Sequence, residues 1–148
     1  MVALMAGAFI AYDHFHTQAL FTRTVGNVLQ AMKMQLSEHQ AESGCLTVPD
    51  EATVQGLTQA GLLVLDADLP WQLDIDYQTG SNHQVTAYQL TLTASSEREG
   101  EQLRQFAPKT EESWSYTGQT LTVQRLVFTP TDEVMKQEYD PTTGCFAW

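Results

Sequence analysis

The hydrophobic pattern of the first 43 residues predicts one long helix. No proline interrupts this stretch, and residues 1–12 form an almost unbroken apolar run. After this run, apolar residues recur at steps of three and four, which is the period of one face of a helix. The members of this stripe are Phe15, Phe21, Val25, Val28, Leu29, Met32 and Leu36. We therefore expect the helix to begin in an apolar environment and to continue onto a folded domain.

The long helix is predicted to end at Ser43 and Gly44, because glycine readily adopts the left-handed conformation that closes a helix. A short second helix is predicted over residues 50–60. Pro49 and Asp50 suit its start, and Gly61 occupies the position of a C-terminal cap. The region between the long helix and the strands is thus a connection with one small helix.

The rest of the chain shows the two-residue period of β-strands. In residues 71–77, large apolar side chains alternate with glutamine and aspartate, which predicts a strand with one face in the core. Residues 85–94 repeat this alternation after a loop rich in glycine, serine and asparagine, so an antiparallel hairpin is expected. Residues 113–116 and 121–128 frame a second turn and predict a second hairpin. The charged residues 97–106 between the hairpins suit a short surface helix or an irregular connection.

These elements predict an α+β fold, with a long N-terminal helix packed on an antiparallel sheet of about four strands. A sheet with one apolar face needs a cover, and the helix offers an apolar stripe of suitable length. We expect residues 1–43 to form a stalk helix, of which residues 1–20 are the hydrophobic part. Residues 44–148 are expected to form one globular head.

The apolar run at the N-terminus has three interpretations. It is shorter than the roughly 20 residues that a membrane-spanning helix requires. It is also a poor secretory signal, since no basic residue precedes it. The run is the remainder of a longer anchor that starts upstream of Met1, a helix buried among copies of itself in an assembly, or the central helix of a monomeric domain.

The charge of the chain is concentrated in the predicted head. The sequence has 18 acidic residues against 7 lysines and arginines, a formal charge of −11. In the first 40 residues, the charges of Asp13, Arg23, Lys33 and Glu38 cancel. A head with this excess of negative charge repels phosphate backbones and anionic lipids, so we expect no nucleic-acid partner.

Two cysteines bracket the strand-rich region. Cys45 and Cys145 either form a disulfide or remain buried free thiols. In the chain-entropy model, a disulfide that closes a loop of about 100 residues contributes roughly 4 to 5 kcal/mol to stability. Neither has a lysine or arginine near it in sequence that would activate a thiolate.

The sequence contains no motif that indicates an enzyme or a cofactor. It has no nucleophile elbow, zinc-protease motif, phosphate-binding loop or dinucleotide fingerprint. His14 and His16 point to different sides of a helix and do not share a ligand face. Aspartates near the first predicted strand are weak calcium candidates, because carboxylate oxygens suit this ion, but a solvated acidic surface is the favoured interpretation. These candidates are Asp66, Asp68, Asp74 and Asp76.

The order of long helix, antiparallel strands and cysteine-bounded C-terminus resembles that of type IV pilins and type II secretion pseudopilins. The resemblance covers the layout of the whole chain. It implies a minor pilin-like subunit whose N-terminal helix is anchored in the inner membrane before assembly and then packs against other subunits. The head would lie in the periplasm or outside the cell, and Cys45 and Cys145 would correspond to the disulfide that tethers a pilin's C-terminal region. The resemblance places the assembly contacts at Leu4, Phe9, Ile10, Phe15 and Leu20.

Two parts of the family pattern are not in this sequence. A pilin precursor carries a basic leader, and most mature subunits have glutamate at the fifth position, where this chain has Met5. If the sequence begins partway down the stalk, the glutamate lies upstream of Met1. The alternative function is an exported soluble binding or adhesion module with a buried central helix.

Overall fold

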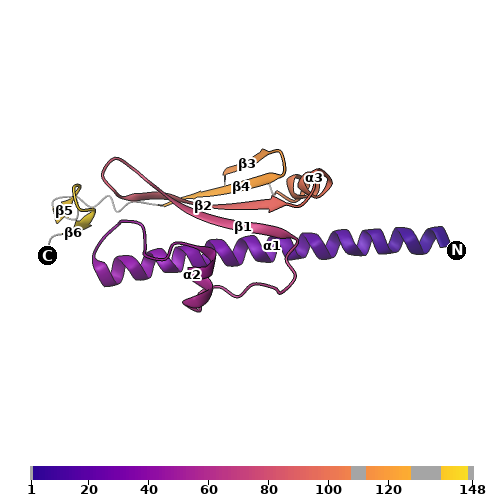
Figure 1. Cartoon of the computed structure of the whole chain (residues 1–148), viewed down its shortest axis with the longest axis horizontal. Helices are drawn as coiled ribbons and strands as arrows, with labels where there is room; N and C mark the ends of the chain where they lie inside the picture. The colour runs from indigo at the N-terminus through magenta and orange to yellow at the C-terminus, as the bar shows by residue number, and fades with distance from the viewer. Residues whose placement is uncertain (1, 108–112, 128–137, 147–148) are drawn as a thin grey trace.

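The protein consists of a long helix that runs along one side of a twisted antiparallel sheet (Figure 1). The computed structural model describes residues 2–107, 113–127 and 138–146, with side chains described from His14 onward. The long helix, α1 (Val2–Ser43), ends where Gly44 adopts a φ of 68°. The predicted α+β class and the predicted end of the helix are therefore confirmed.

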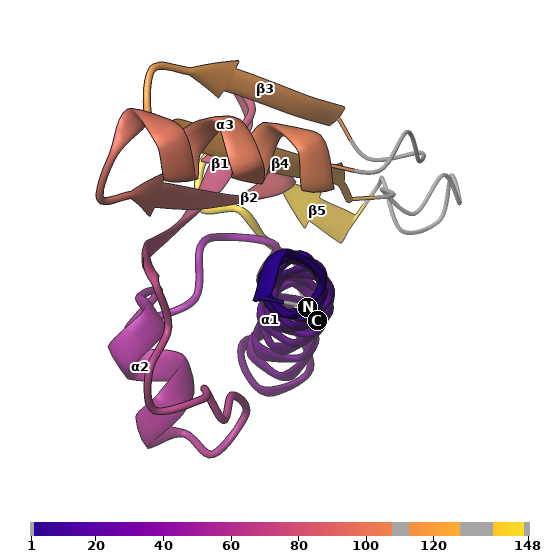
Figure 2. The same cartoon turned by 90° about the vertical axis from the view of Figure 1, so that its right-hand side faces the viewer.

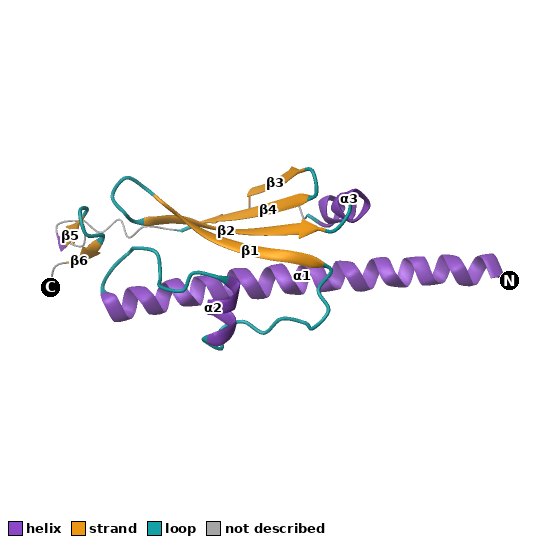
Figure 3. Cartoon of the chain, viewed as in Figure 1, coloured by secondary structure: helices purple, strands orange, loops and turns teal. Residues whose placement is uncertain are grey.

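The main sheet contains four strands in the order β1-β2-β4-β3, and all neighbouring strands are antiparallel (Figure 3). Both predicted hairpins are present, because β1 pairs with β2 and β3 pairs with β4. A second sheet of two short strands, β5 and β6, lies at the end of the molecule opposite the N-terminus. The strands are β1 (Trp71–Thr79), β2 (Val85–Ala94), β3 (Ser113–Thr117), β4 (Thr120–Leu126), β5 (Tyr139–Asp140) and β6 (Cys145–Phe146).

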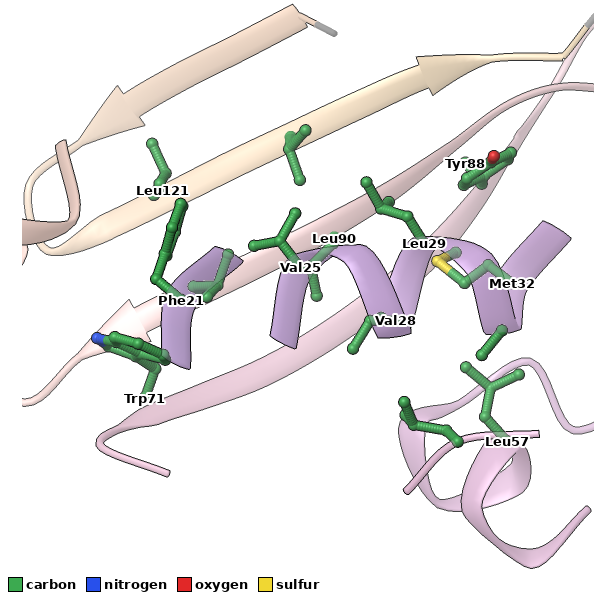
Figure 4. Packing of buried hydrophobic residues seen from close by; sticks show 14 of the residues in the cluster. Phe21, Val25, Val28, Leu29, Met32, Leu57, Trp71, Tyr88, Leu90 and Leu121 are labelled. Carbon is green, nitrogen blue, oxygen red and sulfur yellow. The ribbon is translucent and has the colours of Figure 1, made fainter. Parts of the chain in front are cut away.

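The core lies between α1 and the face of the sheet that carries the alternating apolar residues (Figure 4). Seen along α1, the helix lies below the sheet, with the short helix α2 to one side of it (Figure 2). The helix contributes Phe21, Val25, Val28, Leu29, Met32 and Leu36, and the sheet contributes Leu90, Leu92, Leu121 and Val123. The predicted stripe thus packs on the predicted apolar strand face from Phe21 onward.

The second helix, α2 (Val54–Gln59), is shorter than the sequence predicts. Glu51 has a left-handed φ of 55°, so the chain cannot enter a helix at Asp50. The side chain of Thr53 instead caps the helix by accepting a hydrogen bond of 2.9 Å from the Gly56 N–H. A Cβ atom at Gly56 would lie 2.1 Å from the Glu51 carbonyl oxygen, so this close approach requires glycine.

The charged segment after β2 forms a regular helix, α3 (Glu97–Phe106), which is capped by Ser96. Leu103 and Phe106 turn into the core, while Arg104 lies over the Tyr116 ring at 5.7 Å. Figure 1 shows α3 at the end of the sheet nearest the N-terminal part of α1. The helix therefore closes this end of the core.

The C-terminal region is fastened to the end of α1 by a disulfide between Cys45 and Cys145, with an S–S distance of 1.95 Å. The interpretation of these cysteines as free thiols is therefore wrong. Backbone hydrogen bonds of 2.8 Å join Leu46 N to Gly144 O and Phe146 N to Gly44 O on either side of the disulfide. The two segments are thus joined by both a covalent bond and a short ladder of hydrogen bonds.

Candidate assembly surface

The helix α1 has two parts that differ in exposure. From Phe21 to Leu36, the residues that face the sheet are buried. Between His14 and Leu20, by contrast, most residues are exposed, including Phe15 at 68%. Figure 1 shows the N-terminal part of α1 continuing beyond the sheet and α3. The stalk predicted over residues 1–43 is therefore free of the head only in its first part.

An aromatic cluster around Phe21 packs α1 against the head near the end of the core. The Phe21 ring lies 5.9 Å from Trp71, 5.6 Å from Phe106 and 5.9 Å from Trp114 between ring centroids. Toward the N-terminus, the His14 ring still contacts Phe106 at 5.3 Å. At 1.5 Å per residue, the helix from Val2 to His14 extends about 18 Å further along its axis.

Two of the predicted assembly residues have described side chains, and these two side chains differ in exposure. Phe15 is exposed and agrees with a role in contacts outside the head. Leu20 is partly buried and packs against the head's own core, so it is less available than the prediction implies. The other three, Leu4, Phe9 and Ile10, lie outside the residues whose side chains are described.

The calcium candidates remain on the surface without forming a ligand group. Asp66 accepts hydrogen bonds from Arg23, with a distance of 3.0 Å between Arg23 Nη2 and Asp66 Oδ2. Asp68, Asp74 and Asp76 are exposed. Within the described parts of the chain, no three histidine, cysteine or acidic side chains are grouped so that they could hold a metal. The ion pair of Arg23 and Asp66 joins α1 to the loop after α2, which no local sequence signal indicated.

Among the described residues, the titratable group with the most strongly shifted pKa has a structural role. The Tyr77 hydroxyl lies 2.9 Å from both the Met32 carbonyl oxygen and Gln35 Oε1, and it donates to this pair of acceptors. Burial, and secondarily the neighbouring Tyr88, raises the pKa of Tyr77 above its ordinary range. Gln35 Nε2 in turn donates to the Glu51 carbonyl oxygen at 3.2 Å. This chain of hydrogen bonds ties β1, α1 and the connection to α2 together.

The two described tryptophans, His39 and His83 take part in packing or in bonds between loops. Trp71 is buried, Trp114 is partly buried, and Trp148 lies outside the described residues. His39 Nε2 lies 3.0 Å from Thr47 Oγ1, and His83 Nδ1 lies 3.1 Å from the Pro141 carbonyl oxygen. These two histidines therefore connect the end of α1 and the β1–β2 loop to the disulfide-bonded region.

The fold and the exposed helix define an α+β head with a protruding N-terminal helix. Comparison of the chain with protein-family models, with curated proteins and with solved structures gave no match. None of the described helical segments combines the length and the apolar character needed to cross a membrane.

Proposed function

We propose that this protein is a structural subunit of a filament like the type IV pilus or the type II secretion pseudopilus. The protruding part of α1 packs against the same part of neighbouring subunits, and the head lies on the outside. One observation carries this proposal: the N-terminal part of α1 continues beyond the sheet and α3 (Figure 1), and Phe15 next to this part is exposed. Before assembly, this apolar segment is proposed to rest in the inner membrane with the head on the periplasmic side.

The physical reason is the apolar character of the protruding segment. Residues 1–12 carry no charged side chain, and Phe15 continues this apolar surface toward the head. In water, a helix that is apolar on all sides gains stability when its surface is buried against another apolar surface. Neighbouring copies of the same helix provide such a surface.

The distribution of charge supports contact through the helix rather than through the head. The charged residues among the first 40 cancel, so two copies of this part of α1 approach each other without net repulsion. Residues 41–148, which include the whole head, carry the whole excess of the −11 charge, so the heads repel one another at low ionic strength. Salt reduces this repulsion, since the Debye length falls from about 10 Å at 0.1 M to about 3 Å at 1 M. Assembly is therefore expected to increase with ionic strength.

A second function is favoured by the burial of the other half of α1. Residues from Phe21 to Leu36 form the core of the head, as a central helix does in a self-contained domain. An exported soluble binding or adhesion module has the same core. In that case α1 makes no specific contact with other copies.

Chemical crosslinking at two matched positions distinguishes these functions. Both native cysteines are disulfide-bonded, so a cysteine introduced by Phe15→Cys is the only free thiol among the described residues. Leu126→Cys is the control, because Leu126 on β4 is equally exposed at 71% but belongs to the head. We expect a bismaleimide crosslinker to give covalent dimers of the Phe15→Cys protein, more of them at 1 M than at 0.1 M NaCl. The control should remain monomeric.

Equal yields at both positions, or monomers at both, would contradict the filament proposal. Monomers at both positions together with a monodisperse full-length chain in the absence of detergent would favour the binding module.

A further inference from the structure

The face of the sheet that points away from α1 carries a regular set of uncharged polar side chains. Successive strand residues point to opposite faces, so the residues between the buried ones on β2, β4 and β3 share this outer face. The register aligns them in three rows across the strands. We call these residues the hydroxyl–amide face, and its rows are Thr93, Thr120 and Thr117; Thr91, Thr122 and Ser115; and Gln89, Gln124 and Ser113.

No described helix packs its apolar side chains on the hydroxyl–amide face. The buried residues of α1 pack on the opposite face of the sheet, and Leu103 and Phe106 of α3 belong to the same core. The members on β3 are exposed, and those on β2 and β4 are partly exposed. The part of the chain that the structure describes thus leaves this face accessible.

The composition of the face differs from that of the rest of the head. It has seven hydroxyl and two amide side chains and no charged one, in a chain with 18 acidic residues. The same rows acquire charge only on the edge strand β1, where Asp74 pairs with Thr91 and Asp76 pairs with Gln89. Solubility alone does not require a neutral surface, since charged side chains serve this purpose better.

The side chains of the face are already ordered by contacts with each other. Thr91 Oγ1 and Thr122 Oγ1 are 3.4 Å apart. Gln124 Nε2 donates to Gln78 Oε1 at 3.0 Å, and Gln78 Nε2 donates to Gln89 Oε1 at 2.6 Å. A surface whose side chains are held in place loses less conformational entropy when it binds a ligand.

We infer that the hydroxyl–amide face binds a neutral polysaccharide that lies across β2, β4 and β3. Hydroxyl and amide groups both donate and accept hydrogen bonds, as the hydroxyls of a sugar chain do, and neighbouring strands present them about 4.8 Å apart. The nine side chains of the face include no lysine or arginine to hold phosphate or sulfate groups and no apolar group. The exposed Leu126, which follows Gln124 on the same side of β4, lies beside these rows and is a single apolar side chain. Asp74 and Asp76 at its border repel polyanions. The partner that matches this charge pattern is an uncharged chain of sugars.

The test is affinity gel electrophoresis of the full chain in gels that contain hydroxyethyl cellulose, dextran or laminarin, with polygalacturonate as the anionic probe. We expect at least one neutral probe to slow the wild-type protein and polygalacturonate to leave it unaffected. The triple variant Thr91→Val, Thr93→Val and Thr122→Val keeps the shape of the side chains and removes three hydroxyls. Its dissociation constant should rise at least tenfold. Thr58→Val, on the exposed surface of α2, is the matched control and should bind as the wild type does.

A second variant distinguishes a loss of binding from a change of fold in the triple variant. Gln124→Glu keeps the side-chain shape and places a negative charge on the face, and it should weaken binding severalfold. The inference would be overturned if no neutral probe slowed the wild type, if the triple variant bound as tightly as the wild type, or if polygalacturonate bound as strongly as the neutral probes. A shift of the triple variant to a smaller oligomer would also overturn it, because the face would then be a contact between copies. Crosslinking through Phe15→Cys tests the filament separately, since the two surfaces share no residue.

Discussion

Replacing two phenylalanines six positions apart on α1 tests where the helix stops belonging to the head. Phe21 is 1% exposed and its ring contacts three other aromatic rings, whereas Phe15 is 68% exposed. Truncation of a buried phenylalanine to alanine typically costs about 3 to 5 kcal/mol, because the lost burial is combined with a cavity. For a chain of about this size, each kcal/mol lowers Tm by about 2 to 4 °C. Phe21→Ala should therefore lower Tm by roughly 6 to 20 °C.

The same truncation at Phe15 removes no packing within the described head. We expect the free energy of unfolding of Phe15→Ala to stay within about 0.5 kcal/mol of the wild type. Thermal unfolding followed by circular dichroism measures both variants, and crosslinking measures their self-association. Phe15→Ala should weaken association while leaving Tm unchanged.

The reasoning would be refuted if Phe15→Ala lowered Tm as much as Phe21→Ala does. The N-terminal part of α1 would then be packed within its own molecule. A Phe21→Ala protein with the Tm of the wild type would refute the aromatic cluster as the point where helix and head join.

Three further predictions concern the head. In urea unfolding, Gly144→Ala should destabilise the protein by more than the roughly 1 to 2 kcal/mol that a left-handed φ alone costs, because the new Cβ would lie 2.4 Å from a threonine side chain. Gly61→Ala should show only the cost of the left-handed φ, because no atom lies within 4 Å of its Cβ position. Replacing Cys45 and Cys145 by serine should cost about 2 to 5 kcal/mol, and a reducing agent should lower the Tm of the wild type but not of this variant. Tyr77→Phe should cost about 1 to 2 kcal/mol near neutral pH through the lost hydrogen bond. The folded state raises the pKa of Tyr77, so the stability of the wild type should fall as the pH rises above about 10, the pKa of tyrosine in the unfolded state. Tyr77→Phe should reduce this fall. An equal fall in the variant would show that another group causes it.

Much of the fold followed from local patterns. The steps of three and four residues from Phe21 to Leu36 predicted the buried face of α1, and alternation predicted both hairpins. The start of α2 was missed because Glu51 has a left-handed φ and its carbonyl oxygen lies close to Gly56, and residue type reveals neither feature.

The surfaces were harder to predict than the elements. The alternation around Thr91 and Thr122 is visible in the sequence, but the rows of the hydroxyl–amide face exist only through the register of β2, β4 and β3. The bond between Arg23 and Asp66 likewise joins positions 43 residues apart, which no local pattern relates.

The sequence by itself determined the helix, the strands and the separation of a nearly neutral helix from an acidic head, because periodicity and charge are properties of short segments. Only the tertiary structure decided where α1 leaves the head and which polar side chains form one surface. Both depend on how far the sheet reaches along the helix, and this length is set by pairing and packing between distant parts of the chain.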